Sequence, residues 1–306
     1  MKIPVLRLVA ALALSGPAVA ATVSDPLEPE IVTSDIDLFF GIYDAAGGKP
    51  DAAALQPYID SGSPGVQGFI EHRISSAENL AKVIAAEPAI YEAARACAAS
   101  LGDVEARVRA GFLALAQLYP EARFPAVYLV IGANNSGGTA NPEALMIGLE
   151  VMCTPPVASD WPLDIRLTHI ILHELMHSVQ AGFEGDTVLS LSLNEGVAEF
   201  MTELTTGSIS NRHLLAWTKG REAEFERRFA AEMHGHDFSP WLYNGAGTPA
   251  APGDLGYWVG YRIAKSFYDR APDKRAAIRA MLQATDAEAF LADSAWKPAE
   301  PPPPNP

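Results

Sequence analysis

The sequence predicts a mostly helical α+β protein with one small sheet near its middle. Of the 306 residues, 49% are hydrophobic and 19% are charged, and the mean hydropathy is +0.07, which is the balance of a globular chain. Apolar residues recur at helical spacing before residue 120 and again after residue 164. Between these parts the run Ala126–Ile131 is apolar and rich in β-branched residues, which indicates a strand.

The two ends of the chain are predicted to lie outside this fold. Residues 1–21 combine Lys2 and Arg7 with a short apolar run and the small residues Ala18–Ala21, a pattern typical of a signal peptide. Pro298–Pro306 contains six prolines and is expected to be a disordered tail. The rest is expected to form one domain, 22–297, with a helical front at 33–120, a small sheet at 124–152, a pair of helices at 164–206 and a C-terminal helical lobe at 211–292.

In the helical front, the first helix is expected over Ser34–Ala46, because apolar residues share one face and two glycines follow. Ser75 and Glu78 have the spacing of a capping box, so a long helix is expected to begin there and to run beyond Tyr91.

The sheet is expected to contain two strands. Ala126–Ile131 is the first, Asn134–Gly138 is expected to be a loop, and Leu145–Val151 is the second strand. Helical spacing then returns, and it predicts helices at about 165–181, 190–206, 220–233, 254–269 and 272–284.

The charge of the chain excludes some partners. Acidic residues outnumber basic ones by 37 to 22, which gives a net charge of −15 and a pI near 4.8. Cleavage of the signal peptide would leave 20 basic and 37 acidic residues, a net charge of −17. A nucleic-acid partner is therefore not expected, and no apolar run reaches the ~20 residues of a membrane span. The signal peptide predicts an exported protein, either periplasmic or secreted.

The chain has only two cysteines, Cys97 and Cys153, so a zinc site built from four thiolates is excluded. Export to an oxidising compartment allows a disulfide between them. Two buried free thiols are the alternative, and the sequence leaves both open because it does not give the Cα–Cα distance.

One motif carries chemistry. His173, Glu174 and His177 form His-Glu-x-x-His inside an apolar helical run. Residues four apart lie on one face of a helix, so both imidazoles can reach one Zn²⁺. Glu174 borders the same cleft and is expected to act as general base toward a zinc-activated water.

A third ligand is expected downstream in Asn194-Glu195-Gly196-Val197-Ala198-Glu199. The 17 residues between His177 and Glu195 are enough for a loop and an antiparallel helix. Glu199 lies one helical turn beyond Glu195 and could instead orient a ligand histidine through its far nitrogen. Spacing alone does not decide which glutamate binds the metal.

These two motifs resemble those of the gluzincin metallopeptidases. The resemblance implies that the third ligand is the Glu of the Asn-Glu pair, Glu195, and that Glu199 is a partner of a ligand histidine. The wider pattern resembles the DUF2268 type of predicted zinc-dependent proteases, which is related to the GldB-like gliding-motility proteins. That second resemblance rests on the motifs Phe39-x-x-x-Tyr43-Asp44, Tyr58-x-x-x-Gly62-Ser63, Arg73-Ile74-x-Ser76, Trp241-Leu242-Tyr243 and Asp254-Leu255-Gly256-Tyr257-x-x-Gly260-Tyr261.

Gluzincins stabilise the oxyanion with a Tyr or His after the third ligand, and this resemblance implies Tyr257 or Tyr261 for that role. Each could equally be a core aromatic residue. Tyr243, His234 and His236 are lesser candidates.

Two further expectations concern the surroundings of the metal. His169 lies one turn before His173 and is interpreted as a supporting or core histidine, because three residues over two helical turns do not suit one tetrahedral ion. The clan resemblance gives Leu145–Val151 the role of an exposed edge strand that pairs with an extended peptide, and an ordinary core strand is the alternative.

The sequence therefore predicts an exported, gluzincin-like zinc metallopeptidase with one Zn²⁺ per chain, acting on peptides or unfolded proteins. The alternative is a non-catalytic protein with a zinc-peptidase fold that serves in binding or envelope assembly. Glu174 favours the enzyme, because a structural metal site has no need of a general base.

Overall fold

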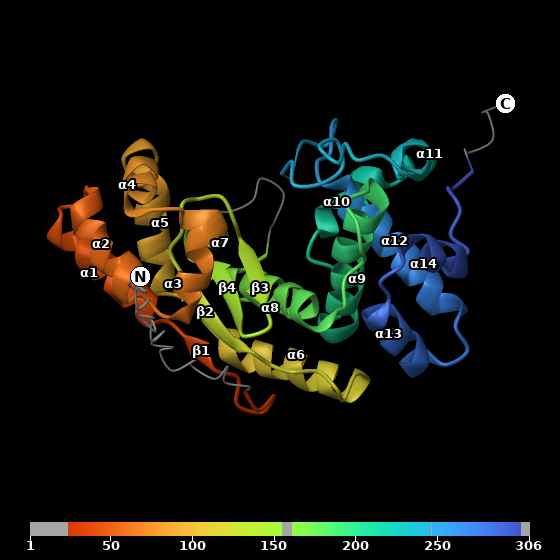
Figure 1. Ribbon diagram of the computed structural model, residues 1–306, viewed down its shortest axis with the longest axis horizontal. Coiled ribbons are helices and arrows are strands. Elements are labelled where there is room, and N and C mark those ends of the chain that lie inside the picture. The colour runs from red at the N-terminus through yellow and green to blue at the C-terminus, as the bar shows by residue number, and fades with distance from the viewer. Residues whose placement is uncertain (1–23, 155–160, 246, 301–306) are drawn as a thin grey trace, which may run out of the picture.

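A computed structural model describes residues 24–154, 161–245 and 247–300 (Figure 1). The predicted signal peptide at 1–21 and residues 301–306 of the predicted tail lie outside the described residues. Ala299, within that predicted tail, donates its N–H to the buried carboxylate of Glu226 at 2.6 Å, so the chain is held as far as this residue. Among the described residues, no helix is long and apolar enough to cross a membrane.

Four strands form one mixed sheet in the order β1-β2-β4-β3. Strands β1 (Ile31–Val32), β2 (Ala126–Val130) and β4 (Ala144–Gly148) are parallel, whereas β3 (Gly138–Asn141) runs antiparallel to β4. Every residue of β2 and β4 is buried, which suits the apolar runs of a central parallel pair. The expected mostly helical α+β fold with a small sheet is confirmed.

The helical front covers one side of this sheet (Figure 1). The hydroxyl of Tyr58 donates to the carbonyl of Ile131 at 2.9 Å, and that of Tyr91 donates to the carbonyl of Gly132 at 3.0 Å. These two bonds fasten the front to the end of β2. The elements of the front are α1 (Ser34–Ala45), α2 (Ala52–Ser61), α3 (Pro64–Phe69), the π-helix η1 (Ile70–Ile74), α4 (Ala77–Ala86) and α5 (Pro88–Ala98).

The expected long helix from Ser75 is wrong in two respects. Ser76 is the N-cap and accepts the N–H of Asn79 at 3.2 Å, while Ser75 precedes it at φ +67°. The helix then ends at Ala86, and α5 begins at Pro88. Proline has no N–H to donate within a helix and is favoured in a first turn, so it separates α4 from α5.

The expected strand Leu145–Val151 is also partly wrong. Strand β4 ends at Gly148, and Leu149–Cys153 forms the short helix α7. The buried carboxylate of Glu150 accepts the N–H groups of Gly132 and Asn134 at 2.9 and 3.1 Å, so it anchors the chain after β2. Moreover, β4 lies between β2 and β3, so it is not an edge strand. The edge strand on this side of the sheet is β3. It lies in a polar segment that lacks the alternating or apolar pattern of a strand.

A disulfide joins Cys97 in α5 to Cys153 in α7, with a Cα–Cα distance of 5.8 Å. It connects the front to the end of the sheet and decides between the two alternatives left by the sequence. Disulfides persist in oxidising compartments, so the bridge suggests an exported or envelope location.

Helix α8 (Leu163–Val179) lies between the sheet and the C-terminal lobe (Figure 1). Helix α6 (Val104–Leu118) packs on it closely, and a Cβ at Gly111 would lie 2.3 Å from a methyl group of Leu172. The helices expected after residue 164 are confirmed within a few residues, while α10 and α14 were not expected. The helices that follow α8 are α9 (Val188–Thr206), α10 (Arg212–Thr218), α11 (Glu222–Glu232), α12 (Leu255–Arg270), α13 (Lys274–Gln283) and α14 (Ala287–Ser294).

Helices α9 and α12 cross with their backbones in contact. A Cβ added at Gly196 would lie 2.0 Å from the carbonyl carbon of Gly260, and a Cβ at Gly260 would lie 1.8 Å from the carbonyl oxygen of Ser192. A Cβ added at Gly256 would lie 2.7 Å from the hydroxyl oxygen of Ser192. Small residues four apart on both helices therefore permit this crossing, which sets the distance between Glu195 and the tyrosines of α12.

Candidate metal centre

Two ligand atoms come from one face of α8. His173 and His177 are one turn apart, and their Nε2 atoms lie 3.1 Å from each other. His173 is buried, while His177 is half-buried and closer to solvent. The expected positioning of both imidazoles by one helix is what the structure shows.

The third ligand atom comes from α9. Oε2 of Glu195 lies 3.1 Å from Nε2 of His173 and 3.2 Å from Nε2 of His177. The neighbouring Asn194 fixes the loop between the helices, because its side chain accepts the N–H of Phe183 at 2.8 Å and donates to its carbonyl at 3.3 Å. The Asn of the Asn-Glu pair thus holds α9 against the end of α8.

These three side chains form a group that could hold a metal ion. Donor atoms bound at about 2.1 Å to a tetrahedral ion lie about 3.4 Å from one another. The three distances of 3.1 to 3.2 Å are close to that spacing. Two imidazoles and one carboxylate leave a fourth position for another ligand, which is the arrangement of a catalytic rather than a closed structural site.

The outer nitrogens of the two histidines differ in their surroundings. A ligand Nε2 requires the proton on Nδ1, where it needs an acceptor. Nδ1 of His173 lies 3.4 Å from Oε1 of Glu199, and Nδ1 of His177 lies 2.8 Å from the Gln180 amide. The Nε2 atom of Gln180 also donates to the carbonyl of Asn194 at 3.2 Å, so this amide connects His177 to α9.

The charges of the group are strongly coupled. Burial raises the pKa of Glu195, but the imidazoles of His177 and His173 outweigh burial and hold this pKa well below its usual range. Burial lowers the pKa of His173, but the carboxylates of Glu195 and Glu199 outweigh it and raise this pKa well above its usual range. Glu195 is therefore ionised at neutral pH, as a metal ligand has to be.

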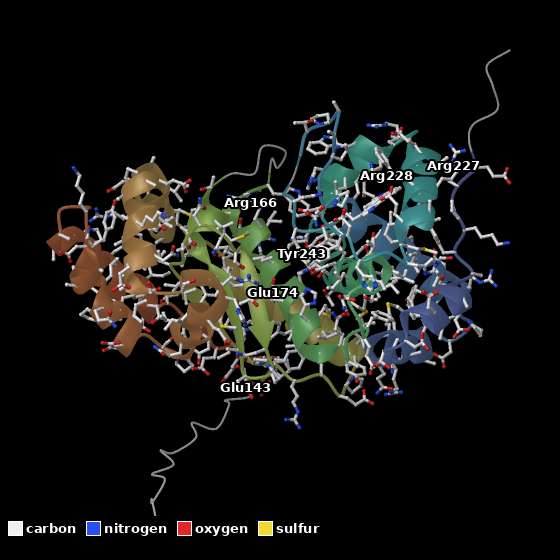
Figure 2. All side chains as sticks on the ribbon, turned by 45° about the horizontal axis from the view of Figure 1, so that its top comes forward. Glu143, Arg166, Glu174, Arg227, Arg228 and Tyr243 are labelled. Carbon is white, nitrogen blue, oxygen red and sulfur yellow. A yellow bond between two sulfur atoms is a disulfide. The ribbon has the colours of Figure 1, made fainter. Side chains whose placement is uncertain are left out.

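Glu174 lies beside the three ligands, buried against the edge strand. A Cβ at Gly138 would lie 2.7 Å from Oε1 of Glu174, so only glycine at this position of β3 leaves room for the carboxylate. Burial raises the pKa of Glu174, and the nearby His177 and His173 partly offset that effect. Figure 2 labels Glu174 and Tyr243 in the middle of the molecule, where the sheet side meets the C-terminal lobe.

Glu199 is buried and is held by the loop after α9. Its Oε2 accepts the N–H of Ser210 at 3.0 Å, and its Oε1 accepts from the side-chain amide of Asn211 at 3.1 Å. The carboxylate thus faces His173 from a fixed position, as a residue that orients a ligand would.

The tyrosines divide into two sets. The ring of Tyr257 lies nearly parallel to that of His173, with centroids 6.2 Å apart, and Tyr243 donates its hydroxyl to Oε1 of Glu195 at 3.0 Å. Burial raises the pKa of Tyr243 and Tyr257, and the charge of Glu195 adds to it in both. Tyr261 instead donates to Glu203 at 2.9 Å, one turn of α9 beyond Glu199.

The remaining histidines lie elsewhere. His234 pairs with Glu288 at 2.7 Å and His236 with Asp186 at 2.8 Å, both on the exposed surface. The described residues bring neither one into the metal group.

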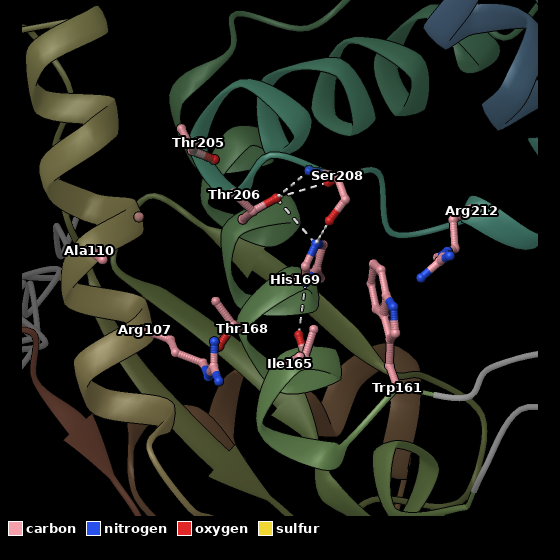
Figure 3. Close-up of a pocket in the computed structure, with 11 residues that line it drawn as sticks. Arg107, Ala110, Trp161, Ile165, Thr168, His169, Thr205, Thr206, Ser208 and Arg212 are labelled. Atoms are coloured by element: carbon pink, nitrogen blue, oxygen red, sulfur yellow. Dashed lines mark hydrogen bonds between the residues drawn. The ribbon is translucent and has the colours of Figure 1, made fainter.

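His169 lines a separate cavity of about 370 Å³ on another face of α8 (Figure 3). Its Nε2 lies 3.0 Å from the hydroxyl of Ser208, and its Nδ1 lies 2.9 Å from the carbonyl of Ile165. Arg212 and Trp161 stand on the same wall, with the guanidinium 5.3 Å from the ring centroid. His169 is therefore satisfied within its own surroundings and does not reach the metal group.

The sequence patterns predicted little or no role for two residues that lie near the ligands. Tyr243 was a lesser candidate, and the structure places it in a loop with φ +58°. Gln180 was not considered, although its position three residues after His177 places it on the same helix face.

Residues 240–298 match the family model of the gliding motility protein GldB. The match covers 59 of 306 residues, and it includes Tyr243 and Tyr257 but neither α8 nor α9. Neither a curated protein nor a solved structure matches the chain. No metallopeptidase family matches it either, so the gluzincin-like architecture stays a prediction.

Proposed function

We propose that the protein is an exported zinc metallopeptidase. The observation that carries the proposal is the triangle of His173, His177 and Glu195 ligand atoms beside the buried carboxylate of Glu174. Two imidazoles and a carboxylate with a fourth position open are typical of zinc hydrolases. A carboxylate next to such a group is the usual general base. The disulfide and the GldB match support an exported or envelope location.

Zinc held by these three side chains would lower the pKa of a water molecule and polarise a peptide carbonyl. Glu174 would accept the proton of the attacking water and pass it to the leaving amine. Its raised pKa suits this role, because the carboxylate holds the proton more readily than an exposed one. Glu199 and Gln180 would fix the orientation of the two imidazoles.

The developing oxyanion needs a hydrogen-bond donor. Tyr257 and Tyr243 both face the ligands, and both keep their hydroxyl protons at neutral pH because their pKa values are raised. We favour these two over Tyr261, whose hydroxyl is bonded to Glu203.

An extended peptide could pair with the free edge of β3. This strand packs against α8, and its Gly138 touches Glu174, so a peptide added there would pass the general base. The strand that offers an edge to the substrate is therefore β3 rather than the segment Leu145–Val151.

The second candidate is a non-catalytic zinc-peptidase-fold protein of envelope assembly or binding. The match of residues 240–298 to the GldB model favours it. The two functions differ in their need for Glu174.

The test combines metal analysis with protease assays. Purified protein is reconstituted with zinc, and its metal content is measured beside cleavage of unfolded protein, with and without chelator. We expect one zinc per chain, chelator-sensitive cleavage, and a loss of at least ~100-fold in Glu174→Gln. The exposed Glu184→Gln is the matched control and should behave as wild type. Absence of zinc after reconstitution would overturn the proposal, and zinc binding with activity unchanged in Glu174→Gln would favour the second candidate.

A further inference from the structure

Arg73 lies in a π-helical turn, a backbone feature that often occurs at functional sites. It lies in η1 (Ile70–Ile74), and short π-helical turns are rare and frequently found at such sites. The turn ends at Ser75, which adopts φ +67° and donates its N–H to the carbonyl of Ile70 at 2.7 Å. A left-handed serine costs free energy, so the surrounding structure has to enforce this conformation.

Within the part of the chain that the structure describes, the guanidinium of Arg73 has no partner. Its Nε is buried without a hydrogen bond, and no described residue forms an ion pair or a hydrogen bond with its side chain. Arg95 and Arg279, by contrast, each pair with a carboxylate, Asp44 and Glu121 respectively. A partly buried cation without a partner is costly unless something else binds it.

The backbone of Arg73 lies beside the loop that leads into β3. Its carbonyl accepts from the side-chain amide of Asn135 at 2.9 Å, and Asn135 precedes the start of β3 at Gly138, which touches Glu174. Its charge lowers the pKa of both Glu174 and Tyr243, although burial raises both by more. The guanidinium therefore lies near enough to Glu174 and Tyr243 for its charge to act on both.

The rest of this site is acidic. Glu174, Glu195 and Glu199 lie around the two histidines and Asp254 lies near Glu195, so even with a divalent ion the site has an excess of negative charge. A substrate carboxylate would be repelled here unless a cation met it. Arginine suits this task, because its planar guanidinium binds a carboxylate in a bidentate way.

We propose that Arg73 is a substrate-binding residue that recognises a carboxylate of the peptide, close to the bond that is cleaved. This inference rests on the proposed peptidase function. The carboxylate comes either from the C-terminus of the peptide or from an Asp or Glu side chain, and both present the same chemistry to the guanidinium.

The test measures binding to the zinc-loaded protein separately from turnover. Three dipeptide hydroxamates are compared by calorimetry: a free C-terminal acid, its C-terminal amide, and an amide that carries an Asp side chain. We expect wild type to bind at least one carboxylate form about 10- to 100-fold more tightly than the neutral amide. The carboxylate form that binds more tightly shows whether Arg73 recognises the C-terminus of the peptide or an acidic side chain.

Arg73→Met should bind all three hydroxamates with nearly equal affinity, whereas Arg73→Lys should keep part of the preference. Arg109→Met, which removes a half-buried arginine paired with Glu105, is the matched control. Zinc content and melting temperature show whether each variant is folded. If Arg73→Met does not fold, the comparison of Arg73→Lys with wild type still tests the inference.

The inference is overturned if wild type shows no preference for a carboxylate, or if Arg73→Met retains the preference of wild type. A preference that depends on Arg73 in a protein that cleaves no peptide would uphold carboxylate binding by Arg73 and refute the proposed activity. Cleavage by wild type without any such preference would do the reverse, and failure to bind any hydroxamate would refute both.

Discussion

Replacing Glu199 by Gln should weaken zinc binding without removing a ligand. Glu199 faces Nδ1 of His173 at 3.4 Å and is held by Ser210 and Asn211. The amide keeps the size of the side chain, but it removes the negative charge and one acceptor oxygen. The Nδ1–H form of His173, which frees Nε2 for the metal, then loses its stabilising partner.

The size of the effect follows from the position of Glu199 behind the ligand. Loss of such an outer partner typically costs 10- to 100-fold in metal affinity, which is about 1.4 to 2.7 kcal/mol. At saturating zinc the folded state loses the same amount of stabilisation. The entropy of unfolding for a chain of this length is ~0.6 kcal/mol per degree, so the zinc-induced rise in melting temperature should shrink by roughly 2–5 °C.

The assay is a competition titration with a chromogenic zinc chelator, combined with thermal unfolding in zinc and in chelator. Glu203→Gln is the matched control, because Glu203 is one turn further along α9 and accepts from Tyr261 rather than facing His173. Zinc affinity of Glu199→Gln within twofold of wild type would refute the reasoning. An equal loss in Glu203→Gln would show that the effect is a general weakening of α9.

Three further outcomes are expected. Replacing Cys97 and Cys153 by Ala opens a loop with a sequence separation of 56, which should cost about 4 kcal/mol in urea unfolding, and a loss under ~1 kcal/mol would contradict this. Burial raises the pKa of Glu150 from 4.5 to about 7, so the folded state binds its proton more tightly than the unfolded state does. Stability should therefore fall by up to ~3 kcal/mol as pH rises from 4.5 through 7, and Glu150→Gln should abolish this part of the pH dependence. Gly138→Ala should displace Glu174 and reduce peptidase activity while zinc content stays at wild-type level, and unchanged turnover would argue against the close contact at β3.

The metal group could be predicted because its geometry is mostly local. His173 and His177 are related by one helical turn, so their proximity follows once the helix forms. Glu195 needed only a short loop and a returning helix, and the structure brings its Oε2 to within 3.2 Å of both imidazoles. The same local reasoning located most of the helices, since their apolar faces repeat within each segment.

The sheet shows where local reasoning fails. β1 has two residues and β3 reads Gly-Thr-Ala-Asn, so neither carries an alternating or apolar pattern. Both exist because β2 and β4 offer hydrogen-bond partners to them. Which strand lies at the edge depends on that pairing order, and the sequence does not contain it in any one segment.

The roles of side chains that reach the metal centre from distant segments could not be predicted from the sequence either. Tyr243 contacts Glu195 across 48 positions of sequence, and Arg73 is about 100 positions from Glu174. A tyrosine in a loop or an arginine in a short motif has many ordinary explanations in a sequence. Only the folded chain shows that Tyr243 donates to Glu195 and that Arg73 has no partner among the described residues.

The crossing of α9 and α12 connects the metal group to the segment that resembles GldB. Gly196 directly follows Glu195, and it touches Gly260, one turn from Tyr257, within the matched residues 240–298. The matched segment thus supplies Tyr243 and Tyr257 beside the candidate metal group, while α8 and α9 supply its three side chains and Glu174. A binding protein would need the tyrosines and the metal group but not Glu174, because only proton transfer requires a carboxylate at that position. The buried Glu174, fitted against a glycine of the edge strand, is therefore the feature that favours catalysis over binding.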